Sequence, residues 1–318
     1  MSGASVCILG GTGFVGSRLA ARLARTGHAV TVLSRNLEAH KELRVLPGVA
    51  VENCDVYDEA QLAEHFRRHE VVVNLVGILN ERGFGGRGFR HAHVELTRAA
   101  LQAARSAGVR RFLQVSALGA AEDAPSHYLR SKGAAERLIR AQRDGLDWTI
   151  YQPSVIFGPG DAFLNRFASL LGTVPLVFPL AMPEARLQPV HVDDVIAALI
   201  IGVDGRAASG RTYQLGGPRV YSLREIVEFV ARICGHRRLV VGLPRAASRL
   251  QGLAMDFVPG RPFSSDNYRS LTVDNVCRED GFAPLGIRPQ SMEGAARLYL
   301  GASADNARLS DLRTRAGR

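Results

Sequence analysis

Short apolar runs alternate with amphipathic stretches along the first half of the chain. The runs have the length and β-branched content of buried strands, and the stretches between them repeat their apolar residues with the period of a helix. Predicted strands cover 5–10, 29–35, 49–56, 70–77, 110–117 and 147–154, and predicted helices cover 13–27, 58–69, 91–108 and the segment around Tyr128. This alternation predicts an α/β fold, a Rossmann-type doubly wound parallel sheet with helices on both faces.

The pattern changes after about residue 155. Prolines interrupt the chain, and helical stretches alternate with short strands instead of long buried ones. We therefore expect a Rossmann domain at 1–155 and a smaller C-terminal α/β lid lobe at 156–300 that partly returns to the main sheet. The last segment, 301–318, has little apolar content, so we expect a flexible tail.

A glycine-rich turn joins the first predicted strand to the first predicted helix. In LGGTGFVGSRLA (9–20), Gly10 permits a tight turn, Gly13 lets the backbone approach a pyrophosphate, and the helix amino terminus offers free N–H groups. A plain strand–helix turn is the alternative, but the flanking strand and helix are what dinucleotide binding requires. The predicted cofactor-binding residues of this turn are Gly10, Thr12, Gly13, Phe14, Val15 and Gly16.

The end of the second predicted strand indicates which dinucleotide is bound. An NAD site usually has an acidic residue there for the ribose 2′-hydroxyl, whereas this chain has Ser34 and Arg35. A hydroxyl and a guanidinium suit a 2′-phosphate, so we expect NADP(H), with NAD(H) as the alternative if Arg35 is ordinary surface charge. Further predicted contacts lie at later strand ends and in the loop over the nicotinamide: Asp55, Val56, Val76, Gly77, Pro153 and Val155.

Tyr128 and Lys132 have the spacing of a proton-transfer pair. They lie four residues apart on a predicted helix and therefore share a face. Of the 40 basic residues only Lys41 and Lys132 are lysine, a bias typical of a GC-rich genome that uses arginine where charge alone is needed. A retained lysine indicates chemistry that needs a compact ammonium. The alternative is that both are ordinary exposed helix residues.

Charge and cysteine content narrow the classes of function. The net charge is +10, but the arginines are scattered, and the one Gly-Arg-rich patch, 81–90, is expected to be a mobile loop. We therefore expect no nucleic-acid partner. Four cysteines without paired spacing predict neither a disulfide framework nor a metal site. The segment HVDDV (191–195) allows a metal or acid–base interpretation, but a helix start explains it better.

Neither a secretory signal nor a membrane span is predicted. The amino terminus runs directly into a strand, and the longest uncharged run, 167–183, contains prolines and is shorter than the roughly 20 apolar residues that a span needs. We expect this run to be a lid packed on the core, with membrane contact that is peripheral at most. The expected location is the cytoplasm, with the inner face of the cytoplasmic membrane as the alternative.

Seven short motifs follow one another along the chain. They are the glycine pattern, CDVYD (54–58), NLVG (74–77), VSA (115–117), YLRSK (128–132), QPSVIFG (152–158) and HVDDV (191–195). In this order they resemble the short-chain dehydrogenase/reductase superfamily, in its extended and atypical branches, which include NAD-dependent epimerases and dehydratases. Longer stretches, among them 93–120 and 153–168, resemble the nucleotide-binding accessory subunit family of respiratory complex I, over nearly all of residues 4–300.

The resemblance to the superfamily implies a mechanism with two departures in this chain. Tyr128 is implied as general acid or base, Lys132 as the residue that lowers the pKa of Tyr128 and holds the nicotinamide ribose, and Ser116 as the donor to the substrate carbonyl. However, Ser116 and Tyr128 are only 12 positions apart, so part of the substrate-positioning loop is missing, and His93 stands where extended members usually have asparagine. Both features are similar to the complex I accessory subunit, whose nucleotide is a held structural element.

We therefore expect an NADP(H)-binding protein that acts in a respiratory or quinone context with weak or no turnover. The expected partners are the nicotinamide dinucleotide and either respiratory complex I or quinone-synthesis proteins. The alternative is an active NADP(H)-dependent oxidoreductase or epimerase on a quinone precursor, a hydrophobic carbonyl or a sugar nucleotide. Whether the protein is an enzyme stays open at this point.

Overall fold

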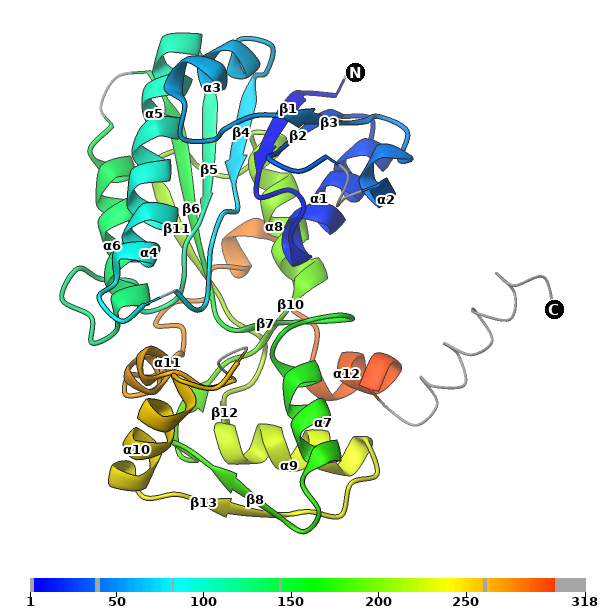
Figure 1. Ribbon diagram of the computed structural model, residues 1–318. Helices are drawn as coiled ribbons and strands as arrows, with labels where there is room; N and C mark the ends of the chain where they lie inside the picture. Colours follow the sequence, from blue (N-terminus) through cyan, green and yellow to red (C-terminus); the bar gives the residue numbers. More distant parts are fainter. Residues whose placement is uncertain (1–2, 38–40, 82, 143–144, 260–261, 301–318) are drawn as a thin grey trace. The chain divides into compact units, whose positions relative to one another are not determined.

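The computed structural model describes residues 3–37, 41–81, 83–142, 145–259 and 262–300. The chain divides into two units, which are described separately below and drawn together in Figure 1. Unit 1 comprises Met1–Pro153, Val195–Leu215 and Glu279–Ile287, and unit 2 comprises Ser154–Asp194, Gly216–Arg278 and Arg288–Arg318. The predicted flexible tail at 301–318 lies outside the described residues.

A seven-stranded parallel sheet forms the centre of unit 1, in the order β11-β6-β5-β4-β1-β2-β3. Its strands are β1 (Ser5–Leu9), β2 (Ala29–Ser34), β3 (Val49–Asn53), β4 (Val71–Asn74), β5 (Arg111–Val115), β6 (Asp147–Pro153) and β11 (Arg211–Leu215). The order reverses at β1, which pairs with β2 on one side and β4 on the other, and open α/β sheets bind ligands at such a reversal. The predicted doubly wound parallel sheet is confirmed.

Helices cover both faces of this sheet. The helices of unit 1 are α1 (Phe14–Arg25), α2 (Lys41–Arg44), α3 (Glu59–Phe66), α5 (Leu96–Ala107), α6 (His127–Arg140) and most of α8 (Val192–Val203), with the short 3-10 helix η3 (Ala283–Leu285). Figure 1 shows α3, α5 and α6 together on one face, where Phe112 and Ile150 join their core. On the opposite face α8 packs closely, because Gly202 lies against Tyr151 and Leu113. Burial on both faces explains why the strands are continuous apolar runs.

The helix predicted at 91–108 is longer and less regular than its sequence pattern indicates. It begins with the short helix α4 (Arg87–Phe89), continues as the π-helix η2 (Arg90–Glu95) and becomes α-helical only in α5. Gly86, which has a φ of 77°, precedes α4. A π-helical turn is rare and frequently lies at a functional site. Here it contains His93, which is buried.

Unit 2 contains short ribbons and helices around a core of its own. In the described residues the ribbons are β7 (Ile156–Phe157) with β10 (Val190–His191), β9 (Arg186–Leu187) with β12 (Tyr221–Ser222), and β8 (Val177–Leu180) with β13 (Leu239–Gly242). The helices are α7 (Leu164–Thr173), α9 (Leu223–Ile233), α10 (Arg245–Met255), α11 (Ser265–Ser270) and α12 (Met292–Leu300). Phe157, Phe178 and Phe229 belong to the core. No helix in the described part of the chain combines the length and apolar character needed to cross a membrane.

The uncharged run 167–183 is divided between helix α7 and strand β8 of unit 2. Leu171, Phe178 and Leu180 from this run lie in the core of the unit, whereas Leu176 and Val177 are exposed. The run therefore packs on the core with only some of its apolar residues.

Helix α6 approaches the segment after β5 so closely that only glycine fits at the contact. A Cβ atom on Gly133 would lie 2.5 Å from the carbonyl carbon of Ala121. We predict that Gly133→Ala lowers the free energy of unfolding by about 1–3 kcal/mol, because overpacking outweighs the roughly 1 kcal/mol by which alanine favours a helix. Urea denaturation measures this change. Gly85→Ala is the control, since a Cβ there meets no atom within 4 Å, and an equal loss in both variants would contradict the packing argument.

Candidate functional site

The turn after β1 has three glycines that are needed for three different reasons. Gly10 has a φ of 75°, and a Cβ on it would lie 3.0 Å from the backbone of Val76. A Cβ on Gly16 would overlap the carbonyl oxygen of Gly10, so helix α1 packs directly on the turn. Gly13 differs, because its nearest neighbour would be the Gly10 oxygen at 3.4 Å, an ordinary contact distance. The neighbouring protein atoms do not exclude a side chain at Gly13, which is exposed. The absence of a side chain at this position therefore leaves space for a ligand.

The amino terminus of α1 is suited to an anion. Gly13 is its N-cap residue, no side chain caps the helix, and its first turn contains no acidic residue. Ordinary helices satisfy these N–H groups with a capping side chain, whereas an uncapped terminus presents them and the positive end of the helix dipole to an anion. Of the predicted residues here, Thr12, Phe14 and Val15 are half-buried. The donor set fits a dinucleotide pyrophosphate.

The residues predicted to select the ribose and hold the adenine lie near the ends of β2 and β3. Ser34 is buried, and its Oγ accepts a hydrogen bond from the N–H of Asn36 at 3.2 Å. Arg35 is exposed and stands near Tyr57: burial raises the pKa of the Tyr57 phenol, and the guanidinium partly opposes this. Asp55 accepts the Tyr57 N–H at 3.1 Å. Arg35 and Asp55 therefore lie at the same edge of the sheet.

Val56 lies next to Asp55 but faces inward, because its side chain is buried in the core between the sheet and helices α3 and α5. Tyr57 is also part of a larger stack, since its ring lies parallel to the imidazole of His91 with 4.0 Å between the centroids. His91 belongs to the π-helix η2, so this helix contributes to the same edge.

Asn74, at the carboxyl end of β4, is the centre of a buried polar network. Its amide donates to Gln114 at 2.9 Å and to Thr97 at 3.3 Å, and its oxygen accepts the N–H of Val76 at 3.1 Å. These bonds fix the backbone of Val76 and Gly77 where β4 ends. A Cβ on Gly77 would lie 3.2 Å from the Lys132 ammonium, so this glycine brings the end of β4 next to helix α6.

Lys132 is buried at the carboxyl edge of the sheet. Only 3% of its surface is exposed, and its Nζ donates to the carbonyl oxygens of Val115 at 3.2 Å and Val76 at 3.3 Å. Burial lowers its pKa from 10.5 to about 8, and the nearby Glu136 carboxylate opposes this change. The alternative of an exposed helical lysine is therefore wrong. The ammonium has a third N–H available for a ligand hydroxyl.

Tyr128 lies half-buried on the same helix, against two other rings. The centroid of its ring is 5.6 Å from that of His93 and 5.9 Å from that of Phe89, with edge-to-face geometry in both cases. Burial raises the pKa of Tyr128 to about 12. A phenol with a raised pKa is a poor proton donor and is rarely ionised near neutral pH, which is the reverse of what general acid–base catalysis needs.

His93 is a site residue that the sequence indicated only as a departure from the family pattern. Its Nε2 accepts the N–H of Ile78 at 3.1 Å, so its Nδ1 carries the proton and donates to Ser131 Oγ at 2.7 Å. Ser131 in turn donates to the Tyr128 carbonyl at 2.7 Å. Burial, together with the Lys132 charge, lowers the pKa of His93 to about 2. His93 is therefore neutral and connects the end of β4 to the helix of Tyr128.

Ser116 lies just past the end of β5 and is buried. Within the described residues its Oγ has no hydrogen-bond partner. A buried hydroxyl without a partner costs free energy, so a ligand oxygen that bonded it would relieve that cost. The segment after Ser116 is short and packed, since Ala117, Ala124 and Leu129 form a small cluster with Tyr128. No long substrate-positioning loop separates Ser116 from Tyr128.

The Gly-Arg-rich patch is anchored beside the Tyr128 helix. The buried carboxylate of Glu81 accepts the N–H groups of Gly86 at 2.6 Å and Gly88 at 2.8 Å. A Cβ on Gly86 would lie 2.5 Å from the imidazole of His127, the first residue of α6. Glycines in this patch therefore allow close packing on α6, which the sequence did not indicate.

Pro153 and Val155, both predicted near the nicotinamide, belong to different units. Pro153 ends β6 in unit 1, and its carbonyl oxygen accepts the Leu118 N–H at 3.0 Å, close to Ser116. Val155 belongs to unit 2, where its N–H donates to the Asn275 side chain at 3.2 Å. Within unit 1, Pro153 therefore lies beside Ser116.

The segment HVDDV forms a structural junction. Helix α8 begins at Val192, and the Asp194 carboxylate accepts the backbone N–H of Gln290 at 2.8 Å and its side-chain amide at 3.1 Å. His191 is buried and lies 3.2 Å from the same amide. The described residues include no group of three or more metal-binding side chains.

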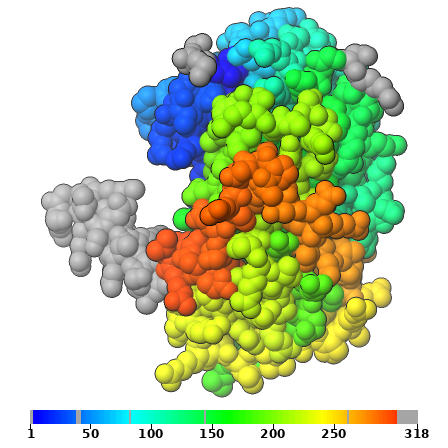
Figure 2. Space-filling model, turned by 180° about the vertical axis from the view of Figure 1, so that it is seen from behind, coloured from blue at the N-terminus to red at the C-terminus, as the bar shows by residue number. Residues whose placement is uncertain are grey.

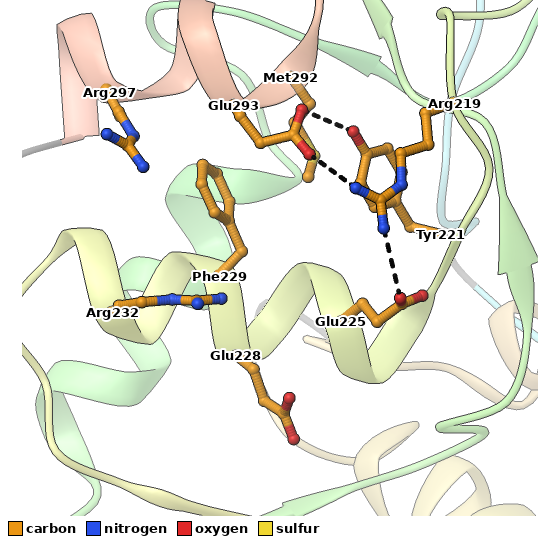
Figure 3. A pocket seen from close by; sticks show the side chains of 9 residues that line it. All are labelled: Arg219, Tyr221, Glu225, Glu228, Phe229, Arg232, Met292, Glu293 and Arg297. Carbon is orange, nitrogen blue, oxygen red and sulfur yellow. Dashed lines mark hydrogen bonds and ion pairs between the residues drawn. The ribbon is translucent and has the colours of Figure 1, made fainter.

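A separate pocket of about 330 Å³ lies on unit 2, between α9 and α12 (Figure 3). Arg219 bridges its carboxylates, with Glu293 at 3.5 Å and Glu225 at 3.8 Å, and Tyr221 donates to Glu293 at 2.7 Å. None of the predicted site residues lines this pocket. Its charges largely neutralise one another, so we assign it to holding β12, α9 and α12 together.

The chain is similar to known nucleotide-binding proteins. A family profile described as NAD(P)H-binding matches residues 10–160. The mitochondrial NADH dehydrogenase (ubiquinone) 1 alpha subcomplex subunit 9 of Arabidopsis thaliana is 30% identical over 314 residues, which cover 92% of this chain and 76% of that protein. A ceramide reductase of Caulobacter vibrioides is 31% identical over 258 residues, which cover 79% of this chain and 77% of that protein.

A solved structure has the same fold. UDP-glucose 4-epimerase from Thermotoga maritima has a TM-score of 0.71 to this chain, with 18% identity, and the match covers 96% of this chain and 99% of that one. At this identity the likeness concerns the fold alone.

The buried ammonium of Lys132 predicts a pH-dependent stability. The unfolded lysine keeps its proton up to about pH 10.5, whereas the folded one releases it near pH 8, so the free energy of unfolding rises with pH between these values. We predict that wild type gains about 1–3 kcal/mol relative to Lys132→Met over this range. Chemical denaturation of both proteins at several pH values measures the difference, which also cancels the titration of the tyrosines. If the difference in unfolding free energy between the two proteins does not change with pH, Lys132 does not have a lowered pKa in the folded protein.

Proposed function

Because the chain belongs to the family of the complex I alpha subcomplex subunit 9, as its motifs predicted, we propose that it holds NADP(H) as a bound nucleotide in a respiratory or quinone context, with weak or no turnover. The observation on which this proposal depends is the buried Lys132 ammonium, which donates to the carbonyl of Val76, the residue whose backbone the glycine turn also approaches. The groups proposed to bind the nucleotide lie at this edge of the sheet, whereas the surroundings of Tyr128, the proposed proton-transfer residue, raise its pKa and leave only a short packed segment before it.

The site residues fit a nicotinamide dinucleotide. In this proposal the α1 amino terminus with Gly13 holds the pyrophosphate, Lys132 donates to the nicotinamide ribose, and Val76 and Gly77 lie under the ribose and ring. The dinucleotide would supply a hydride. The chain's own residues orient it, and neutral His93 keeps a second positive charge out of the site.

Weak turnover follows from the surroundings of Tyr128. Its raised pKa and its contacts with Phe89 and His93 favour the neutral phenol. The packed segment after Ser116 leaves no extended loop to position a substrate, and misplacing reacting atoms by an ångström costs about 100-fold in rate. Binding does not depend on either feature.

We propose NADP(H) over NAD(H) because the end of β2 has a hydroxyl and a guanidinium instead of a carboxylate. Ser34 is buried and orients the turn through Asn36, while Arg35 is exposed and able to reach a 2′-phosphate. NAD(H) would leave this guanidinium without its anionic partner.

An active reductase is the second candidate, favoured by Ser116. Its buried, unpartnered Oγ is placed to donate to a carbonyl oxygen. The similarity to a protein named ceramide reductase supports a hydrophobic carbonyl as the substrate in that case. A quinone precursor or a sugar nucleotide are the other substrates in this proposal.

The proposed setting follows from the named relatives. Proteins called NADH dehydrogenase alpha subcomplex subunit 9 cover most of this chain, so we propose respiratory complex I as the partner, with quinone-synthesis proteins as the alternative. The proposed location is the cytoplasm at the inner face of the membrane, where such partners would be met.

Single-turnover hydride loss distinguishes the two candidates. The purified protein is loaded with NADPH deuterated at the transferable position and mixed with small-molecule extract of the source cells, with Tyr128→Phe alongside. We predict that NADPH stays bound and reduced in both proteins. Deuterium that reaches a product from wild type but not from Tyr128→Phe would establish the reductase and identify its substrate.

Arg35→Asp tests the cofactor preference. We predict that it weakens NADPH binding by about 10- to 100-fold while NADH binding is unchanged or tighter, because a charge-assisted hydrogen bond contributes about 1.5–3 kcal/mol. Isothermal titration with each dinucleotide measures the two affinities. Arg44→Asp, another exposed arginine of unit 1, is the control for a general effect of charge. An equal loss for both dinucleotides in Arg35→Asp would sink the NADP(H) assignment.

A further inference from the structure

Helix α10 of unit 2 packs against the rest of the unit through its small residues. Ser248 and Gly252 are the buried residues of the helix. The Ser248 hydroxyl accepts the Met182 N–H at 3.0 Å and donates to the Leu243 carbonyl at 3.2 Å, and a Cβ on Gly252 would lie 3.3 Å from the Ser264 oxygen. These contacts fix the rotation of the helix about its axis, so its large apolar residues cannot turn inward.

Two large apolar residues of α10, Leu250 and Leu253, face outward, and the exposed Phe257 follows just after the helix ends at Met255. Leu250, Leu253 and Phe257 are 67%, 46% and 81% exposed. Their spacing is i, i+3 and i+7, the spacing by which a helix usually buries its apolar stripe against a core. A stripe of this kind on the outer face indicates that something other than the protein's own core covers it.

The neighbouring ribbon β8–β13 also exposes apolar side chains. Val177 is paired with Leu239 and Pro179 with Val241, and all four are exposed, while Phe178, Leu180 and Val240 between them are buried in the core. The exposed face of a half-buried ribbon is usually polar. Here both faces are apolar.

The helix and the ribbon are neighbours, and their exposed apolar residues are together called the apolar patch. Strand β13 leads into α10, and the Gln251 amide lies 3.5 Å from the Pro179 carbonyl, which links the helix to β8. Figure 1 shows α10, β8 and β13 together in unit 2, and Figure 2 shows the yellow segment that contains α10 and β13 at the surface. The patch comprises Leu176, Val177, Pro179, Leu239, Val241, Leu250, Leu253, Phe257 and Val258.

Most charged residues in the segment that contains β13 and α10 are arginines. Segment 237–258 contains four arginines and one acidic residue, Asp256, which is buried and accepts the Ser265 N–H at 3.1 Å. Arg237, Arg245 and Arg249 are exposed, and none of them pairs with a carboxylate within the described residues. The pocket between α9 and α12, by contrast, pairs its arginine with carboxylates.

We propose that the apolar patch docks unit 2 on an anionic lipid surface. Two leucines on the outward face of α10, a phenylalanine just after it, and arginines that have no carboxylate partner among the described residues are the features of a segment that lies in a membrane interface. A second copy of the chain is a poorer occupant, because a symmetric contact would bring the arginines of both copies together. This surface does not include the nucleotide site and is independent of it.

Vesicle flotation of the full chain tests this proposal. We expect the protein to float with vesicles of phosphatidylcholine mixed with phosphatidylglycerol, less with phosphatidylcholine alone, and less at high salt. The double variant Leu250→Asp/Phe257→Asp should lower the partition coefficient at least tenfold, and Arg245→Gln/Arg249→Gln should lower it only for anionic vesicles. Both pairs are exposed, so folding should be kept, which NADPH binding and circular dichroism verify.

Leu298→Asp is the matched control, since Leu298 is an exposed leucine of α12 outside the patch. It should float like wild type. The proposal is overturned if wild type does not float with anionic vesicles, or if the double variant floats as well as wild type. It is also overturned if wild type sediments as a dimer that the double variant abolishes, because the patch would then be an interface between copies.

Discussion

A positive charge kept away from water is the constraint on which unit 1 depends. The Lys132 ammonium lies where two parallel strands end, because the carbonyls of Val115, at the end of β5, and of Val76, just past the end of β4, both accept hydrogen bonds from it. Asn74 fixes one of these strand ends, and Glu136, one turn along α6, partly balances the charge. Burial nevertheless disfavours the ammonium, as its lowered pKa shows. Such an arrangement reduces stability unless a ligand hydroxyl or phosphate shares the site.

Binding and proton transfer make different demands on this site. In the proposed function, binding uses the exposed Gly13, the uncapped α1 and the Lys132 ammonium, which depend on backbone geometry and on one side chain. Proton transfer also needs a Tyr128 phenol with a lowered pKa and a substrate whose reacting atom is held within a few ångströms of that phenol. The rings around Tyr128 and the packed segment after Ser116 oppose both requirements. The same fold therefore supports a held nucleotide more readily than a rapid reaction.

The two units use their surfaces differently. Unit 1 has its functional groups at the carboxyl edge of a sheet that is apolar on both faces. Unit 2 has a small core and exposes apolar side chains on α10 and the β8–β13 ribbon, where inward packing is done by Ser248 and Gly252. If the apolar patch lies on lipid, unit 2 provides a surface by which the protein stays near a membrane.

The sequence by itself determined the features that depend on near neighbours. Strand–helix alternation predicted the sheet, the glycine spacing predicted the turn between β1 and α1, and the i, i+4 spacing of Tyr128 and Lys132 predicted that they share a helix face. Each of these follows from the local periodicity or backbone freedom of a few consecutive residues. The two lysines among forty basic residues also marked Lys132 correctly as unusual.

Only the tertiary structure decided what these residues touch. His93 contacts Ser131, which is 38 residues away in the sequence, and Lys132 contacts Val76, which is 56 residues away. A local sequence pattern therefore cannot predict either contact. The pattern of α10 would predict that Leu250 faces inward, yet the partners of Ser248 and Gly252, Met182 and Ser264, hold the opposite face against the protein. The burial of Lys132, its pKa and the outward orientation of the apolar residues of α10 all depend on which distant segments pack beside them. Those contacts form only when the whole chain folds.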